Sequence, residues 1–323
     1  MNWKLKALMH NVMPLIPGGD RGHFWIQRHV TKKIPRSEQR LLQAVSAAEK
    51  HIDSFLRYSG TRLDEAVFYE FGAGWDLVTQ LTFFALGTNR QIIVDLKPLL
   101  RADLANDSAK RIRNLTGYDF RRVPEKAIGN DMAHDLLKYY GIEYFAPYDA
   151  RHTSLPESSV DFITSTETIP HIPEQDLKSI LAECARILKP GGIMSMTTNY
   201  DDLYSYFDQS ISAYNFLKFS DTWWRLFNPA RHFQSRLRHS DYVRLFAGVG
   251  FEIVEEEKKP TTPQDFDYLS GLKLADKFHG YTLEDLATHG AHFVVRGKPR
   301  PATVTVSQPG LGPAVVQEGQ RVR

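Results

Sequence analysis

One stretch constrains the fold of this chain more than any other: VFYEFGAGWDLVTQLTFFALGTNRQIIVDL. Its start, Val67–Phe71, is β-branched and aromatic, which is typical of a buried strand. Gly72 and Gly74 allow a sharp turn and a close approach to a ligand, because glycine has no Cβ. The residues after the turn have helical spacing, and Gln91–Asp95 predicts a second strand. This order predicts a parallel α/β unit whose ligand binds outside the carboxyl ends of the strands.

Two kinds of nucleotide-like ligand fit such a turn. The nicotinamide fingerprint is G-x-G-x-x-G, and Leu77 occupies its third glycine position here. Asp95, at the end of the second strand, can accept two hydrogen bonds from a ribose diol. Glu70 stands just before the glycines, where a carboxylate can meet a cationic amino acid moiety. Glu70 therefore favours a ligand that carries such a moiety over a nicotinamide cofactor.

The pattern E-x-G-x-G, followed by a strand that ends in Asp, resembles motifs I and II of class I S-adenosylmethionine-dependent methyltransferases. A second stretch resembles the central half of the same family, in its broad small-molecule (type 11-like) group: APYDARHTSLPESSVDFITSTETIPHIPEQDLKSILAECARILKPGGIMSMT. The chain departs from the family pattern at Asp76, where a third glycine is usual, and at Pro170, where an acidic residue is usual. The resemblance covers about residues 66–198 well and 251–298 weakly.

The resemblance implies S-adenosylmethionine as the cofactor. It also implies that an acidic side chain after the third strand bonds the adenine amine, and that the next backbone N–H meets the ring. The cofactor-binding residues expected on this basis are Glu70, Gly72, Gly74, Asp95, Asp149 and Ala150.

Strands alternate with helices beyond Ala66, which predicts a doubly wound, mostly parallel sheet. The resemblance implies seven strands, with the seventh inserted between the fifth and the sixth in an antiparallel edge. The sequence also predicts a pair of helices between the second and third strands. We expect a helical N-terminal extension over 1–65, a methyltransferase domain over 66–298 with an aromatic lid at about 200–240, and a disordered tail over 299–323.

Charge and cysteine content restrict the functional classes. The formal net charge is +2, which does not favour nucleic acid as a partner. The single cysteine, Cys184, cannot form an internal disulfide, and the chain has no Cys/His spacing typical of a metal site. We therefore expect a cytoplasmic protein without a metal. The N-terminal stretch MNWKLKALMHNVMPLIPGG predicts a helix that packs on the domain or makes weak contact with a membrane surface.

The segment Tyr200–Phe233 carries eleven aromatic residues. Its position after the fifth strand predicts an acceptor pocket and a lid that excludes water. A dimer interface is the alternative, and the oligomeric state stays open. Arginines in and just after the segment suit an acidic acceptor. The predicted acceptor-binding residues are Tyr200, Tyr204, Trp224 and Arg231, and the further arginines are Arg225, Arg236 and Arg238.

The general base has three candidates: His171, His232 and Glu167. An imidazole titrates near neutral pH, although each histidine can also simply order its loop. Adjacent Asp201 and Asp202 are interpreted as a turn. The predicted function is O-methylation of a small molecule or a glycan-linked acceptor. N-methylation of a small molecule and a noncatalytic cofactor-binding module are the alternatives.

Overall fold

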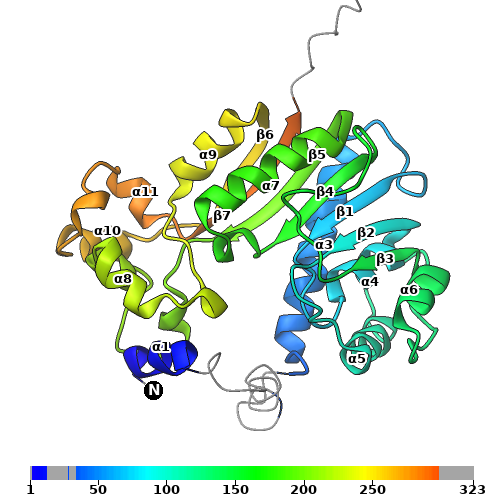
Figure 1. Ribbon diagram of the computed structural model, residues 1–323, viewed down its shortest axis with the longest axis horizontal. Helices are drawn as coiled ribbons and strands as arrows, with labels where there is room; N and C mark the ends of the chain where they lie inside the picture. Colours follow the sequence, from blue (N-terminus) through cyan, green and yellow to red (C-terminus); the bar gives the residue numbers. More distant parts are fainter. Residues whose placement is uncertain (1, 13–27, 29–33, 298–323) are drawn as a thin grey trace, which may run out of the picture.

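The computed structural model describes residues 2–12, 28 and 34–297 (Figure 1), so the predicted tail over 299–323 lies outside the described residues. One seven-stranded sheet forms the centre, in the order β3-β2-β1-β4-β5-β7-β6. Neighbours from β3 to β5 pair in parallel, whereas β7 is antiparallel to both β5 and β6. The predicted mostly parallel sheet with an inserted seventh strand is confirmed. The strands are β1 Val67–Phe71, β2 Arg90–Val94, β3 Ile142–Phe145, β4 Val160–Thr166, β5 Leu188–Asn199, β6 Phe251–Lys258 and β7 Gly290–Gly297.

Helices cover both faces of the sheet (Figure 1), and strand side chains alternate between them. Phe68 and Phe162 point to one face, where α3 and α4 pack on them. Tyr69 and Ile163 point to the other, which α7 and α9 cover. Between β2 and β3 lie α5 and α6, the predicted pair of helices. These helices are α3 Glu38–Tyr58, α4 Val78–Leu86, α5 Ala102–Arg113, α6 Met132–Tyr140, α7 Glu174–Ile187 and α9 His239–Gly248.

A second, aromatic core lies beyond the carboxyl end of β5. We call it the aromatic lobe, and its buried residues are Trp3, Ala7, Tyr204, Tyr214, Phe216, Leu217, Trp224, Leu269, Phe278, Leu286 and Ala287. It joins α1 to short segments that follow β5 and to those between β6 and β7 (Figure 1). Its elements are α1 Trp3–Val12, η4 Leu203–Tyr206, η5 Asn215–Lys218, α8 Asp221–Phe227, η6 Ala230–His232, α10 Pro263–Ser270, η7 Asp276–Phe278 and α11 Leu283–Ala287.

The N-terminal helix α1 packs on the domain, with Trp3 and Ala7 buried. Leu5, Leu8 and Met9 are exposed on its outer side, so contact with a membrane surface stays a prediction. Within the described ranges, no helix is long and apolar enough to cross a membrane. The other helix of the expected N-terminal extension, α3, lies directly on the sheet and shares its core.

Candidate active site

A cavity of about 820 Å³ opens where the carboxyl ends of β1, β4 and β5 meet. The sheet contributes Glu70, Gly72 and Gly74 on one side, and Thr166 and Thr197 on the other. Because the chain reverses its winding between β1 and β4, the loops there diverge and leave space, as is usual for ligand sites in open α/β sheets. The rest of the wall is Arg36, Arg40, Gln43, Ala44, Ala47, Lys50, Ala73, Thr79, Glu167, Pro170, His171, Asn199, Leu203, Tyr206, Glu257, Lys259, Pro260, Ala291 and His292.

The two glycines of the turn have different roles. Both have left-handed backbone angles, with φ of +84° at Gly72 and +77° at Gly74. A Cβ on Gly72 would lie 2.3 Å from Cγ2 of Thr168, so glycine is needed there for packing. A Cβ on Gly74 would meet nothing within 4 Å, because it would project into open space. Gly74 therefore keeps the cavity clear beside the turn.

Glu70 is a buried carboxyl on the cavity wall, with 4% of its surface exposed. Burial raises its pKa to about 7, although the hydrogen bond from Gln80 opposes the shift. Gln80 Nε2 donates to Glu70 Oε2 at 2.6 Å and fixes the side chain. A buried carboxyl without a cation is the group that a cationic ligand would convert to its charged form.

Asp95 lies at the end of β2, next to the turn and outside the cavity wall. The backbone N–H of Gly74 donates to Asp95 Oδ2 at 3.2 Å. Burial raises the pKa of Asp95 to about 6, against the effect of backbone hydrogen bonds from Gly74, Lys97 and Leu96. The N–H of Tyr148 donates to the Asp95 carbonyl at 2.8 Å, which brings the end of β3 to the same place.

Asp149 is therefore close to Asp95, but Arg151 already holds its carboxylate. Arg151 Nη2 lies 2.7 Å from Asp149 Oδ2, and this hydrogen bond lowers the pKa of Asp149. The same guanidinium also bonds Asp176, at the start of α7. Ala150 is half-buried against the core. An adenine amine would have to share Asp149 with Arg151.

One wall of the cavity comes from α3 and the residues just before it, which sequence reasoning missed. Arg36 Nε lies 2.6 Å from Asp76 Oδ2, and Lys50 Nζ lies 2.7 Å from Glu257 Oε2. Arg40 has no ion pair within the described part of the chain. A signal was present in the sequence, because positions 40, 43, 44, 47 and 50 share one helical face.

The candidate bases have different positions. His171 and Glu167 both line the cavity, whereas His232 is not one of its lining residues, and its ring lies 5.8 Å from that of Tyr204. His171 Nδ1 lies 2.9 Å from the Phe233 carbonyl, which fixes the ring. Lys259 Nζ lies 3.4 Å from Glu167 Oε1. His171 and Glu167 therefore remain candidate bases in the cavity, whereas His232 packs near Tyr204.

The predicted acceptor residues lie elsewhere than expected. Tyr200, Tyr204 and Trp224 are almost completely buried, and none of them lines the cavity. Tyr204 and Trp224 pack on Trp3 of α1, with ring centroids 5.6 and 6.3 Å away. Tyr200 stacks on Tyr242 of α9. Arg231 lies in η6, and its side chain is outside the described residues. Leu203 and Tyr206 are the members of this segment that reach the cavity.

Two of the other arginines are structural. Arg236 and Arg238 are 6% and 0% exposed, so neither side chain can contact an acceptor bound in the cavity. Arg238 donates to the backbone carbonyls of Tyr200, Leu286 and Thr288. It ties the end of β5 to the segment before β7.

One group of side chains has the composition of a cation site. Glu255, Glu257 and His292 offer ligand atoms that all lie within 4.8 Å of one another. Arg57 and Lys50 already pair with the two carboxylates, at 2.7 Å each. The group is therefore balanced by the cations of α3, and we assign no metal to it.

The family model described as "Methyltransferase domain" matches residues 102–196. The matched segment covers 95 of the 323 residues and identifies a methyltransferase domain in this chain. Its methyl donor is S-adenosylmethionine. The buried Glu70 carboxyl, the open space beside Gly74 and the free guanidinium of Arg40, within the described residues, fit a zwitterionic amino acid moiety joined to a nucleoside.

Curated relatives are enzymes named for a biosynthetic role. The "Ubiquinone biosynthesis O-methyltransferase" of Marinobacter nauticus is 26% identical over 178 residues, which cover 51% of this chain and 70% of that one. The protein of the same name from Aliivibrio fischeri is 27% identical, over 36% of this chain and 47% of that one. The second alignment thus spans less than half of that relative.

Solved structures of methyltransferases also align with this methyltransferase. The geranyl diphosphate C-methyltransferase of Streptomyces coelicolor gives a TM-score of 0.44 at 14% identity, over 82% of this chain and 85% of that chain. A methyltransferase of Methanosarcina mazei gives 0.43 at 16% identity, over 75% and 96%.

Proposed function

We propose that this methyltransferase transfers the methyl group of S-adenosylmethionine to a hydroxyl oxygen of a small molecule. The observation that carries the proposal is the single cavity that joins the Glu70 carboxyl and the glycine turn to a polar far wall. Asn199, Tyr206 and Lys259 form that wall. Cofactor and acceptor therefore share one space, as in-line methyl transfer requires.

The proposed cofactor site uses residues from four elements. Glu70 would hold the ammonium group, and Arg40 the carboxylate. Asp95 would accept from the ribose hydroxyls. Asp149 and the N–H of Ala150 would meet the adenine. A bound cofactor supplies an electrophilic methyl group next to a sulfonium, and the protein contributes binding and orientation.

Oxygen is the preferred acceptor atom for two reasons. The two relatives named above are both called O-methyltransferases, at 26% and 27% identity. The cavity wall also contains groups able to take a proton, His171 and Glu167, which a neutral hydroxyl needs and a free amine does not. A glycan-linked hydroxyl remains within the proposal. N-methylation and a noncatalytic binding module are the alternatives that the experiments below separate.

The first experiment measures binding. Asp95→Ala should weaken the affinity for S-adenosylmethionine by about 1–3 kcal/mol, the range for hydrogen bonds to a charged group. Isothermal titration of wild type and variant measures the difference, and Asp267→Ala, an exposed carboxylate on α10, is the matched control. Equal wild-type affinity for NAD and for S-adenosylmethionine would contradict the cofactor site.

The second experiment identifies the reaction. Purified protein and S-adenosylmethionine are incubated with phenol, catechol, 4-hydroxybenzoate and 3,4-dihydroxybenzoate, and with the corresponding anilines. Mass spectrometry follows the demethylated cofactor and the methylated product. A methyl ether supports the proposal, and a methylated amine favours the N-methyl alternative. Cofactor binding without any turnover would favour the noncatalytic module.

A further inference from the structure

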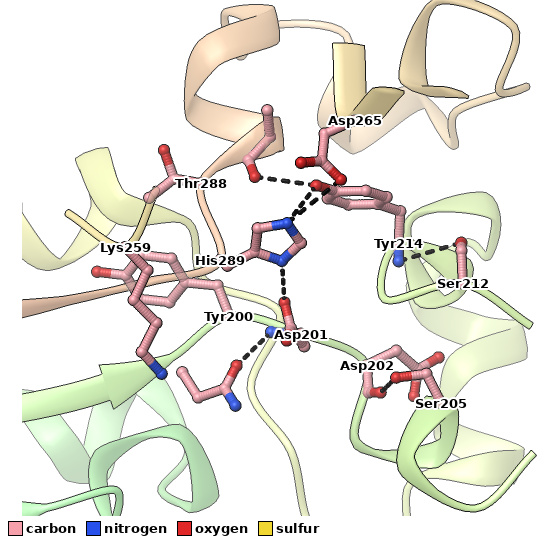
Figure 2. A network of polar contacts seen from close by, with 12 residues as sticks. Tyr200, Asp201, Asp202, Ser205, Ser212, Tyr214, Lys259, Asp265, Thr288 and His289 are labelled. Atoms are coloured by element: carbon pink, nitrogen blue, oxygen red, sulfur yellow. Dashed lines mark hydrogen bonds and ion pairs between the residues drawn. The ribbon is translucent and has the colours of Figure 1, made fainter. Parts of the chain in front are cut away.

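A chain of polar contacts connects the end of β5 with the aromatic lobe (Figure 2). His289, just before β7, lies between two carboxylates. Its Nδ1 is 2.6 Å from Oδ1 of Asp201, and its Nε2 is 3.3 Å from Oδ1 of Asp265 on α10. The hydroxyl of Tyr214 also lies 3.0 Å from Nε2. The imidazole is thus held on both edges.

The other oxygen of Asp201 bonds a residue of the cavity wall. The hydroxyl of Tyr206 donates to Asp201 Oδ2 at 3.0 Å and accepts from Asn199 Nδ2 at 2.7 Å. Both Tyr206 and Asn199 line the cavity. A continuous path therefore runs from the cavity through the Tyr206 hydroxyl to Asp201, with His289 behind it.

The backbone fixes this geometry. The N–H of Asp201 donates to Asn199 Oδ1 at 2.8 Å, which closes a tight turn at the end of β5. The N–H of Tyr200 donates to the His289 carbonyl at 2.8 Å. The pair formed by Asp201 and His289 therefore joins two adjacent strands, β5 and β7. The side chains of Asp201 and His289 are only 16% and 23% exposed. A carboxylate and an imidazole at this depth keep one orientation.

The charges around the path favour a tyrosine that keeps its proton. The ring of Tyr206 is partly exposed, and desolvation of its hydroxyl group raises the pKa to about 12, with Asp201 and Glu167 adding to the shift. The hydrogen bond to Asp201 raises the pKa of His289, which burial opposes and Asp265 supports. Tyr206 is therefore a donor to Asp201 at neutral pH, and His289 donates Nδ1–H to the same carboxylate.

We propose that Tyr206 and Asp201 carry the proton released in methyl transfer and that His289 is a positioning residue for Asp201; this inference rests on the proposed O-methylation. The acceptor's hydroxyl proton moves to the Tyr206 oxygen while the Tyr206 proton moves to Asp201 Oδ2. The acceptor oxygen bonds to the methyl carbon, and the carbon–sulfur bond breaks with its electron pair left on sulfur. A methyl ether and S-adenosylhomocysteine result, and Asp201 later loses the proton to water.

The test compares two tyrosine hydroxyls that each donate to a carboxylate. Tyr206→Phe removes the path, whereas Tyr58→Phe removes a 2.8 Å bond to Glu255 outside the cavity. With the phenol of the panel that wild type methylates best, Tyr206→Phe and Asp201→Asn should each lower kcat about 100-fold or more. Affinity for S-adenosylmethionine should stay within about twofold, and Tyr58→Phe should keep wild-type kcat.

His289 is tested through its position. His289→Gln should lower kcat and leave KM for the phenol unchanged, because the acceptor does not touch it. In the cofactor-free protein, Asp201→Asn should lower the pKa of His289 in an NMR titration, since the carboxylate that raises it is gone. This measurement needs neither acceptor nor turnover.

The outcomes separate the two proposals. A wild-type protein that binds S-adenosylmethionine and methylates no hydroxyl overturns the proposed function. A wild type that does methylate a phenol, with Tyr206→Phe equally active, overturns the proton path alone. Tyr206 is 57% exposed, so its variant is a test that does not depend on the folding of the lobe. An unchanged pKa of His289 in Asp201→Asn would remove the positioning role.

Discussion

At the scale of single residues, the two glycines of the β1–α4 turn give opposite predictions. Alanine at either position meets a left-handed φ, which costs about 1–2 kcal/mol. In Gly72→Ala, the new methyl group also clashes with Thr168. The free energy of unfolding should therefore fall by about 2–5 kcal/mol in total. Gly74→Ala meets no atom of the protein and should lose affinity for S-adenosylmethionine instead. Urea unfolding and isothermal titration measure the two effects. A Gly74→Ala protein that binds the cofactor normally would show that the ligand stays away from the turn.

Single residues were predictable where the chemistry is local. Glu70 and the glycines lie on one strand and its turn, so their spacing along the chain is also their spacing in the cavity. The pairing of Asp201 with His289 was missed because 88 positions separate them, and two adjacent aspartates are typical of a turn. Arg238 was predicted to suit an acidic acceptor, but the structure shows it bonded to backbone carbonyls. A charged side chain can be buried when several carbonyls surround it, which its sequence neighbours do not reveal.

At the scale of elements, α1 depends on one side chain. The Trp3 ring packs between Phe227, Phe219 and Tyr204, with centroids 4.9, 5.5 and 5.6 Å away. Trp3→Ala should cost about 3–5 kcal/mol, and α1 should detach before the sheet unfolds. Hydrogen exchange at α1 and α8 measures this detachment. Leu5→Ala is the control, because Leu5 is 54% exposed and its loss should change stability by less than about 0.5 kcal/mol. Normal protection of α8 in Trp3→Ala would contradict the docking role.

Helices and strands were predictable from the spacing of apolar residues and from the turn residues that end each element. The alternation of strands and helices predicted the mostly parallel sheet, whereas the inserted seventh strand was implied by the resemblance to methyltransferases. The partner of the aromatic segment was not predictable. Trp3 lies about two hundred positions from Tyr204 and Trp224, and aromatic side chains suit a pocket, an interface and a core equally well. In the structure, Tyr204 and Trp224 belong to the core of the aromatic lobe. Tyr206 is the aromatic side chain of that segment that lines the cavity.

At the scale of the whole molecule, a buried histidine bridge joins the N-terminal helix layer to the sheet. His51 of α3 bonds Ser195 of β5 at 2.7 Å and Thr166 of β4 at 3.2 Å. Ser195 bonds His292 of β7 at 2.8 Å. Burial lowers the pKa of His51 to about 3 and that of His292 to about 4, and the nearby Lys50 adds to both shifts. The bridge is therefore made of neutral imidazoles.

This bridge predicts acid lability. An unfolded histidine titrates at about 6.5, so between pH 6.5 and pH 4 the unfolded chain binds protons that folded His51 and His292 refuse. Proton uptake then favours unfolding, and each histidine removes up to about 1.4 kcal/mol of stability per pH unit as pH falls. His51→Gln can keep a hydrogen bond to Ser195 and cannot titrate, so its stability should fall less steeply than that of wild type. Urea unfolding at pH 7, 6 and 5 measures both slopes, with His279→Gln as the exposed control. If His51→Gln loses stability with pH as steeply as wild type, the bridge is not the acid-sensitive link between α3 and the sheet.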